Sequence, residues 1–318
     1  MRIALLVPAP LHAVSGGNAY DRALLDGLRA AGHEAQAIEG AAAFDSLPAD
    51  VLPVIDGRAL PAFIDRAAAM AARRTIGLLH HPIAPESGAT GAAGRSLMPL
   101  LSRVIATSHA VAAQLAADFG IDVAVVEPGT ADLPRSPGSG GPDCAILSVG
   151  ALVPRKGHDV LLRALGKLFD LNWHLTIVGS AGRDPVHAHA LQALAERLGI
   201  TRRVSFAGEV APARLESLWR GADIFALATY WEGYGTTIAE ALKRGIPVAI
   251  TAGGGAGALV TPLSGVVCAP GDEVTLSKSL RRLIFDRDLR RTTADAAWAE
   301  GQALPDWPSQ GRLFAAAL

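Results

Sequence analysis

The sequence has few of the residues that mark a cross-linked, metal-binding or membrane-spanning protein. Only two of its 318 residues are cysteines, Cys144 and Cys268, and each lies in an apolar run. This excludes a disulfide framework and a structural zinc site, and predicts two small buried side chains. Aromatic residues make up only 5% of the chain, so stacking platforms for bases or long glycans cannot be numerous. No apolar run approaches the ~18 residues of a spanning helix.

The charge of the chain is also nearly balanced. It has 29 Lys and Arg against 30 Asp and Glu, a net charge of −1. This argues against a nucleic acid partner, which selects for a basic excess, and it gives no support to peripheral contact with a membrane. The opening run MRIALLVPAP is too short for a secretory signal. We therefore expect a cytoplasmic protein, although a local anion site remains compatible with this composition.

Short apolar runs alternate with longer amphipathic segments along the whole chain. The runs at 2–8 and 144–150 predict strands, and the segments at 18–31 and 157–169 predict helices. Such alternation is typical of parallel sheets that are covered on both faces. Further helices are expected over 59–74, 109–120, 236–244, 273–285 and 287–301.

One segment interrupts the alternation. Residues 131–143, ADLPRSPGSGGPD, hold three prolines and three glycines and have almost nothing to bury, which predicts a flexible linker. The predicted fold class is therefore α/β, with two doubly wound Rossmann-like domains facing each other across a deep cleft. In such sheets, ligands bind outside the carboxyl ends of the strands.

The strongest polar constellation is WEGYGTTIAEALKRGIPV at 231–248. Glu232 follows a predicted strand, Gly233, Tyr234 and Gly235 form a tight turn, and Thr236 and Thr237 open a helix. Free N–H groups at a helix start form an anion site. Glu240 lies about one turn further, where a carboxylate could accept from sugar or ribose hydroxyls. The alternative is a capped surface helix with two solvated glutamates.

A second constellation, SVGALVPRKGHDVLLRAL at 148–165, places Arg155 and Lys156 after a strand that ends at Gly150. Two adjacent cations there suit a diphosphate, although a solvated loop would look the same.

Two further motifs lie in the first half of the chain. Gly16 and Gly17 allow a ligand to approach the backbone closely, or simply form a turn. His80 and His81 end a predicted strand, and because side chains alternate along a strand, only one of them can face the cleft. Since the pattern lacks the G-x-G-x-x-G spacing, and Glu39 is an uncertain acidic partner, a dinucleotide site is poorly supported.

The sequence gives no sign of a catalytic metal. His187 and His189 are two residues apart on a predicted helix and do not share a face. Asp286-Arg-Asp288 lies between two predicted helices, which favours a capping turn over a D-x-D metal motif. We expect no metal and no other cofactor.

Taken in order along the chain, these motifs resemble family 4 of the retaining glycosyltransferases, which have the GT-B fold. The resemblance rests on SGGNAYDRALLDGLRAAGHE, the Pro128-Gly129 turn, SVGALVPRKGHDVLLRAL, VSFAGEV and EGYGTTIAEAL, in which Glu232 and Glu240 match the E-x7-E motif. One departure is Ala151, where many members carry an arginine that Arg155 would have to replace. The resemblance implies retaining, metal-independent sugar transfer of the hexosyltransferase type from a nucleotide-diphosphate sugar to a small-molecule or lipid-linked acceptor.

The resemblance also implies domain roles. Residues 1–135, completed by a returning helix at 304–318, would form the acceptor-side domain. Residues 136–303 would hold the nucleotide sugar.

The same resemblance assigns roles to single residues. Glu232 would contact the donor sugar, Glu240 the ribose, and Lys156 the diphosphate. His80 takes the H-x-P position near the transferred sugar, with His81 as second choice. The remaining donor-binding residues would be Gly16, Gly17, Arg155, Gly233, Tyr234, Gly235, Thr236 and Thr237.

Two other functions remain open at this point. One is a second type of sugar-nucleotide enzyme on the same fold, although an epimerase would lack the loop between Glu232 and Glu240 in this form, and no lysine is marked out for a phosphorylase cofactor. The other is a noncatalytic sugar-nucleotide-binding partner subunit, against which the intact Glu232, Lys156 and Glu240 argue.

Overall fold

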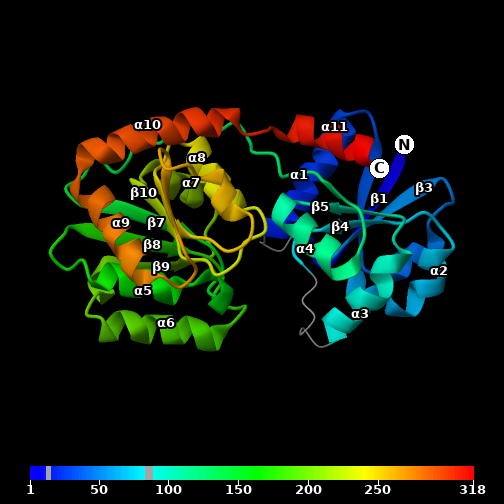
Figure 1. Cartoon of the computed structure of the whole chain (residues 1–318), viewed down its shortest axis with the longest axis horizontal. Helices are drawn as coiled ribbons and strands as arrows, with labels where there is room; N and C mark the ends of the chain where they lie inside the picture. The colour runs from blue at the N-terminus through cyan, green and yellow to red at the C-terminus, as the bar shows by residue number, and fades with distance from the viewer. Residues whose placement is uncertain (12–15, 83–88) are drawn as a thin grey trace. The chain divides into compact units, whose positions relative to one another are not determined.

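The computed structural model divides into two compact units (Figure 1). Unit 1 comprises Met1–Ala131 and Pro305–Leu318, and unit 2 comprises Asp132–Leu304. Each unit contains one six-stranded sheet whose strands are all parallel, so the predicted doubly wound α/β fold class is confirmed. The structure describes residues 1–11, 16–82 and 89–318.

The sheet of unit 1 has the strand order β2-β1-β3-β4-β5-β6. Its strands are β1 (Arg2–Val7), β2 (Glu34–Glu39), β3 (Val51–Asp56), β4 (Ile76–Leu79), β5 (Arg103–Ala106) and β6 (Val123–Val125). Its α-helices are α1 (Gly16–Ala30), α2 (Ala67–Ala71), α3 (Ala89–Leu97), α4 (His109–Phe119) and α11 (Trp307–Ala317). Every residue of β4 is buried, as expected of a central parallel strand.

The last helix of the chain packs against the first helix of unit 1 (Figure 1). Their crossing is close because glycines meet there: a Cβ on Gly311 would lie 2.5 Å from the carbonyl carbon of Gly27. Phe314 of α11 is fully buried in the core beside β1, and Trp307 lies edge-to-face on Tyr20 with ring centroids 5.2 Å apart. The residues after Leu304 thereby complete unit 1.

The sheet of unit 2 has the order β12-β11-β10-β7-β8-β9. Its strands are β7 (Cys144–Val149), β8 (Trp173–Val178), β9 (Val204–Gly208), β10 (Ile224–Leu227), β11 (Val248–Thr251) and β12 (Gly265–Cys268). Its α-helices are α5 (His158–Gly166), α6 (Pro185–Arg197), α7 (Pro212–Arg220), α8 (Thr236–Lys243), α9 (Glu273–Phe285) and α10 (Arg287–Ala303). Both cysteines are buried and free, as predicted.

The segment at the start of unit 2 has neither helix nor strand over 132–140, but two serine side chains in it form hydrogen bonds. The Ser136 hydroxyl donates to the carbonyl of Arg220 at 2.9 Å, and the Ser139 hydroxyl donates to Asp223 at 2.6 Å. These two contacts tie the segment to the rest of unit 2, and its predicted flexibility stays a prediction. Each of these acceptors lies 84 positions away in the sequence, so the composition of the segment gave no sign of the two contacts.

One helical segment differs from the sequence prediction. The helix expected over 59–74 is a 3₁₀ helix over Leu60–Arg66 followed by the short α2. Its buried Leu60 and Phe63 are three residues apart, which is the 3₁₀ repeat. The predicted capping role of Asp286 is confirmed, because its side chain accepts from Leu289 N at the start of α10. In the described part of the chain, no helix has the length and apolar character to cross a membrane.

The strand orders fix where each unit can bind a ligand. In unit 1 the order reverses between β1 and β3, and in unit 2 it reverses between β7 and β10. Loops after the carboxyl ends of two such strands diverge and leave a crevice, which is the usual ligand position in this fold class. The polar residues that follow these four strands are therefore the ones to inspect.

Candidate functional site

The loops that follow β7 and β10 bring three of the predicted residues of unit 2 together. Lys156 Nζ donates a charge-assisted hydrogen bond to Glu232 Oε2. Arg155 Nη1 lies 3.3 Å from the same oxygen and donates to the carbonyl of Trp231 at 2.6 Å. The side chains of Lys156 and Glu232 are only 13% and 14% exposed, so this ion pair is largely shielded from water.

The backbone around this pair is fixed from both loops. The carbonyl of Arg155 accepts from Tyr230 N at 2.9 Å and from the Thr229 hydroxyl at 3.1 Å. Gly157 has φ 60° and comes so close to the neighbouring loop that a Cβ there would lie 1.8 Å from the carbonyl oxygen of Ala228. Only glycine fits this position, so the placement of Lys156 depends on the residue that follows it.

His158 contacts the same loop and was not identified from the sequence as a candidate residue. It is fully buried, and its Nε2 lies 3.3 Å from the carbonyl oxygen of Gly150. Burial lowers the pKa of His158 to about 4, so the ring is neutral near pH 7 and Nε2 carries the proton that this contact needs. His158 therefore holds the backbone at Gly150, the residue directly after β7.

The start of α8 offers the predicted anion-binding backbone. Gly235 is the N-cap in a left-handed conformation and makes no side-chain cap hydrogen bond. Like the first N–H groups of any α-helix, those of Thr236 and Thr237 have no acceptor within the helix. The side chain of Tyr234 is buried in unit 2, only 6% exposed, whereas Thr236 and Thr237 are partly exposed.

Glu240 lies in the second turn of α8. It is half-buried, and burial raises its pKa to about 7, with Arg244 acting in the opposite direction. Arg244 itself is held by two hydrogen bonds to Glu216, at 2.9 and 2.6 Å. Glu240 is therefore close to half-ionised at neutral pH, and hydroxyl donors at its carboxylate would favour the ionised form.

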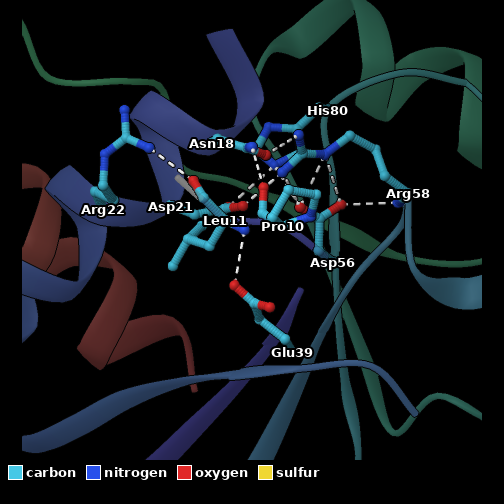
Figure 2. Close-up of polar contacts among 9 residues, drawn as sticks. All are labelled: Pro10, Leu11, Asn18, Asp21, Arg22, Glu39, Asp56, Arg58 and His80. Carbon is cyan, nitrogen blue, oxygen red and sulfur yellow. Dashed lines mark hydrogen bonds and ion pairs between the residues drawn. The ribbon is translucent and has the colours of Figure 1, made fainter. Parts of the chain in front are cut away.

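In unit 1, His80 faces two buried aspartates (Figure 2). Its Nε2 lies 3.4 Å from Oδ1 of Asp21, which comes from α1, and 3.5 Å from Oδ2 of Asp56, the last residue of β3. Both aspartates are 0% exposed and His80 is 8% exposed. The rings of Tyr20 and His80 pack edge-to-face, with centroids 4.8 Å apart. His81, the second choice, is exposed, as strand alternation predicts.

Arg58 joins the two aspartates and was also missed from the sequence (Figure 2). Its Nη2 donates to both Asp21 and Asp56, its Nε donates to Asp56 at 2.9 Å, and its Nη1 donates to Asn18 at 2.7 Å. A Cβ on Gly17 would lie 2.3 Å from Arg58 Nη1. The group that lies close to the Gly17 backbone in this structure is therefore the Arg58 guanidinium. The role of Gly16 and Gly17 toward a ligand stays a prediction.

The charges of this cluster balance. Burial alone would lower the pKa of His80, but the charges of Asp56 and Asp21 outweigh it and raise that pKa to about 9. Burial raises the pKa of Asp21 to about 6. It acts the same way on Asp56, but His80 and Arg58 hold the pKa of Asp56 well below its usual range. Near pH 7 two carboxylates thus face one guanidinium and one imidazolium.

Among the described residues, Asp21, Asp56 and His80 form the one group whose atoms lie close enough to share a metal ion, all within 4.8 Å. The sequence analysis did not bring these three residues together. The three residues are spread over 59 positions of the chain, from Asp21 to His80, and only the fold joins them. Arg58 already donates to Asp56 Oδ2 and to Asp21, so the guanidinium supplies positive charge to both of these carboxylates.

Three side chains hold Pro10 and Leu11, which follow β1 (Figure 2). Glu39, at the end of β2, accepts from Leu11 N at 2.8 Å. Arg22 donates to the carbonyl of Leu11, and Asn18 donates to that of Pro10. The carboxylate at the position of a ribose-binding acid is thus engaged by the protein itself, which agrees with the poor support for a dinucleotide site.

The chain resembles known proteins along most of its length. Residues 131–298 match the model of the family described as glycosyl transferases group 1. A D-inositol 3-phosphate glycosyltransferase of Nocardia farcinica is 32% identical over 229 residues, 65% of this chain and 51% of that protein. The corresponding protein of Corynebacterium jeikeium is 38% identical over 148 residues, 45% of this chain and 35% of that protein. The chain thus spans about half or less of these curated relatives.

Solved structures of similar fold cover nearly the whole chain. Sucrose-phosphate synthase from Thermosynechococcus elongatus superposes with a TM-score of 0.83 at 19% identity, covering 99% of both chains. HepE of Anabaena, in complex with UDP-glucose, gives a TM-score of 0.83 at 22% identity, covering 99% of this chain and 98% of that one. At these identities the likeness concerns the fold alone, and the fold they share with this chain is GT-B.

Proposed function

Because the chain belongs to the family of group 1 glycosyl transferases, we propose that it transfers a sugar from a nucleotide-diphosphate sugar to an acceptor hydroxyl, with retention of anomeric configuration. The observation that carries the proposal is the convergence of Lys156, Arg155 and Glu232 at the β7/β10 reversal of unit 2. A diphosphate needs cations and N–H donors, and a sugar needs a carboxylate that accepts from its hydroxyls.

Unit 2 would hold the donor. Lys156, which is largely shielded from water, would face the diphosphate together with the N–H groups at the start of α8. Glu240, further along the same helix, would accept from the ribose hydroxyls. Arg155 would take over the role of the arginine that many relatives carry where this chain has Ala151.

The chemical step would place the greatest demand on Lys156. The acceptor oxygen bonds to the anomeric carbon as the bond from that carbon to the diphosphate oxygen breaks, and the hydroxyl proton leaves with the diphosphate. Negative charge grows on the leaving oxygen, so a fixed cation stabilises the transition state more than the bound donor. Because Lys156 and Arg155 supply that charge, we propose that transfer needs no metal.

Unit 1 would hold the acceptor and contribute His80. Its imidazolium, held between Asp21 and Asp56, would present positive charge near the transferred sugar, with Gly16 and Gly17 beside the diphosphate. Names of the relatives give the first substrates to test: inositol 3-phosphate as a small hydroxylated acceptor and UDP-glucose as donor. A lipid-linked acceptor is the second class to test.

Turnover of labelled donors tests the proposal against its alternatives. UDP-, GDP-, ADP- and dTDP-sugars are first screened by thermal shift, since ligand at ~100 times Kd should stabilise the protein by about 2.7 kcal/mol. The donor that binds is then incubated with and without acceptors, and the anomeric configuration of the product is read by NMR. A glycoside formed only with acceptor supports transfer. An isomerised donor would indicate an epimerase, and binding without any turnover would indicate a noncatalytic subunit.

A further inference from the structure

The ion pair between Lys156 and Glu232 joins the two groups that the proposed function assigns to different parts of the donor. Lys156 would bind the diphosphate and Glu232 the sugar, yet here each is the partner of the other. A lysine ammonium is a compact point charge, so the Glu232 carboxylate and a diphosphate compete for it. The pair therefore bears on which ligands unit 2 prefers.

Resting on the proposed function, we propose that Glu232 is an exchangeable partner of Lys156 that makes the site favour the intact donor over the spent nucleotide diphosphate. When the donor binds, its diphosphate replaces Glu232 on Lys156, and the released carboxylate accepts from the hydroxyls of the donor sugar. When only the nucleotide diphosphate binds, the carboxylate has no sugar to receive it. Glu232 is then a specificity-determining residue that promotes product release.

The backbone geometry permits this exchange by a side-chain movement alone. Glu232 N donates to the carbonyl of Gly253 at 3.0 Å, and its own carbonyl accepts from Gly255 N at 2.9 Å. Arg155 holds the carbonyl of the preceding Trp231 at 2.6 Å. The loop is thus fixed on both sides, and the part of Glu232 that can change partners is its carboxylate.

Electrostatics gives the two ligands opposite responses to the charge of Glu232. Next to a bare diphosphate, the carboxylate repels the ligand and competes for Lys156, so its negative charge weakens binding. Next to an intact donor, the same carboxylate accepts charge-assisted hydrogen bonds from sugar hydroxyls, which are stronger than those to a neutral amide. Replacing Glu232 by glutamine removes the charge and keeps the shape.

The experiment compares Glu232→Gln with wild type in calorimetric titrations. Two ligands are used. The first is whichever of UDP, GDP, ADP and dTDP stabilises the wild type most in the thermal-shift screen, and the second is the glucose derivative of that nucleotide diphosphate. We expect Glu232→Gln to bind the nucleotide diphosphate about fivefold more tightly, the size expected of a modest ion pair, and to bind the nucleotide sugar several-fold more weakly. Glu196→Gln, an exposed glutamate on α6, controls for the loss of one charge and should change neither affinity.

A double-mutant cycle shows whether the effect runs through Lys156. In a Lys156→Gln background, Glu232→Gln should no longer tighten the nucleotide diphosphate by the same factor. Unchanged or weaker binding of the nucleotide diphosphate by a folded Glu232→Gln protein would overturn the inference while leaving the proposed function intact. A wild type that binds no nucleotide diphosphate and no nucleotide sugar would overturn the proposed function itself, and the inference with it.

Discussion

The protonated state of His80 can be tested by raising the pH. Its pKa is raised from the ordinary 6.5 to about 9 because Asp56 and Asp21 face it in a buried position. A group whose pKa is raised by folding stabilises the folded state fully below its unfolded pKa, and this contribution is lost as the pH rises through the folded pKa. At 1.36 kcal/mol per pKa unit, a change from 6.5 to about 9 corresponds to about 3 kcal/mol.

The loss should fall between pH 6.5 and 9.5. Asp21 has its raised pKa near 6, so it is ionised across this window and its effect on stability is confined to lower pH. Urea unfolding of the wild type at pH 6.5 and 9.5 should therefore show a fall of about 3 kcal/mol in the free energy of unfolding of unit 1. His80→Gln should lack most of this fall.

The same pKa can be read directly by NMR. The chain has nine histidines, and the imidazole signal that disappears in His80→Gln identifies this one. Its titration midpoint should lie near 9 in the wild type and move toward 6.5 in Asp56→Asn, which removes a facing negative charge. A His80 midpoint near 6.5 in the folded wild type would refute the electrostatic description of this cluster.

Three further predictions concern unit 2. Lys156→Met should lower turnover about a hundredfold, roughly 3 kcal/mol of transition-state stabilisation, with a smaller change in donor affinity. An unchanged rate in single-turnover kinetics would show that Lys156 does not contribute to the chemical step. The affinity for the nucleotide diphosphate should rise as the pH increases through about 7, because the Glu240 carboxyl must ionise to accept hydrogen bonds from the ribose hydroxyls. An identical pH profile in Glu240→Gln would refute this. Gly157→Ala should lower the free energy of unfolding of unit 2 by more than about 3 kcal/mol, because Gly157 has a φ of 60° and a Cβ there would lie 1.8 Å from the carbonyl oxygen of Ala228. The control Gly199→Ala, at a φ of 69° with open space around it, should lower it by about 1 kcal/mol. Equal losses in urea unfolding would contradict the packing argument.

The site of unit 2 was visible in the sequence because its parts are local. Arg155 and Lys156 adjoin, and Glu232 to Glu240 forms one continuous motif after a strand. Alternation of strands and helices then indicated that both segments follow carboxyl ends of parallel strands. The contact between Lys156 and Glu232 could not be predicted, because it depends on β10 returning to lie beside β7.

The cluster of unit 1 lacked such a local signal. Asp21 lies on α1, Asp56 and Arg58 lie at the end of β3, and His80 follows β4, so no short window of sequence contains them. Asp56-Gly-Arg58 directly after a buried strand was the sign available, and it becomes informative once β3 is known to neighbour β1. The sequence pattern identified His80, but its aspartate partners required the topology.

The location of the donor site is tested most directly by hydrogen exchange with and without the nucleotide diphosphate. The proposal predicts slower exchange in peptides that cover 150–157 and 229–240, from the loops that carry Lys156 and Glu232, while peptides of α6 remain unchanged. Slower exchange confined to unit 1, or no protection at a saturating ligand concentration, would contradict the assignment of the donor to unit 2.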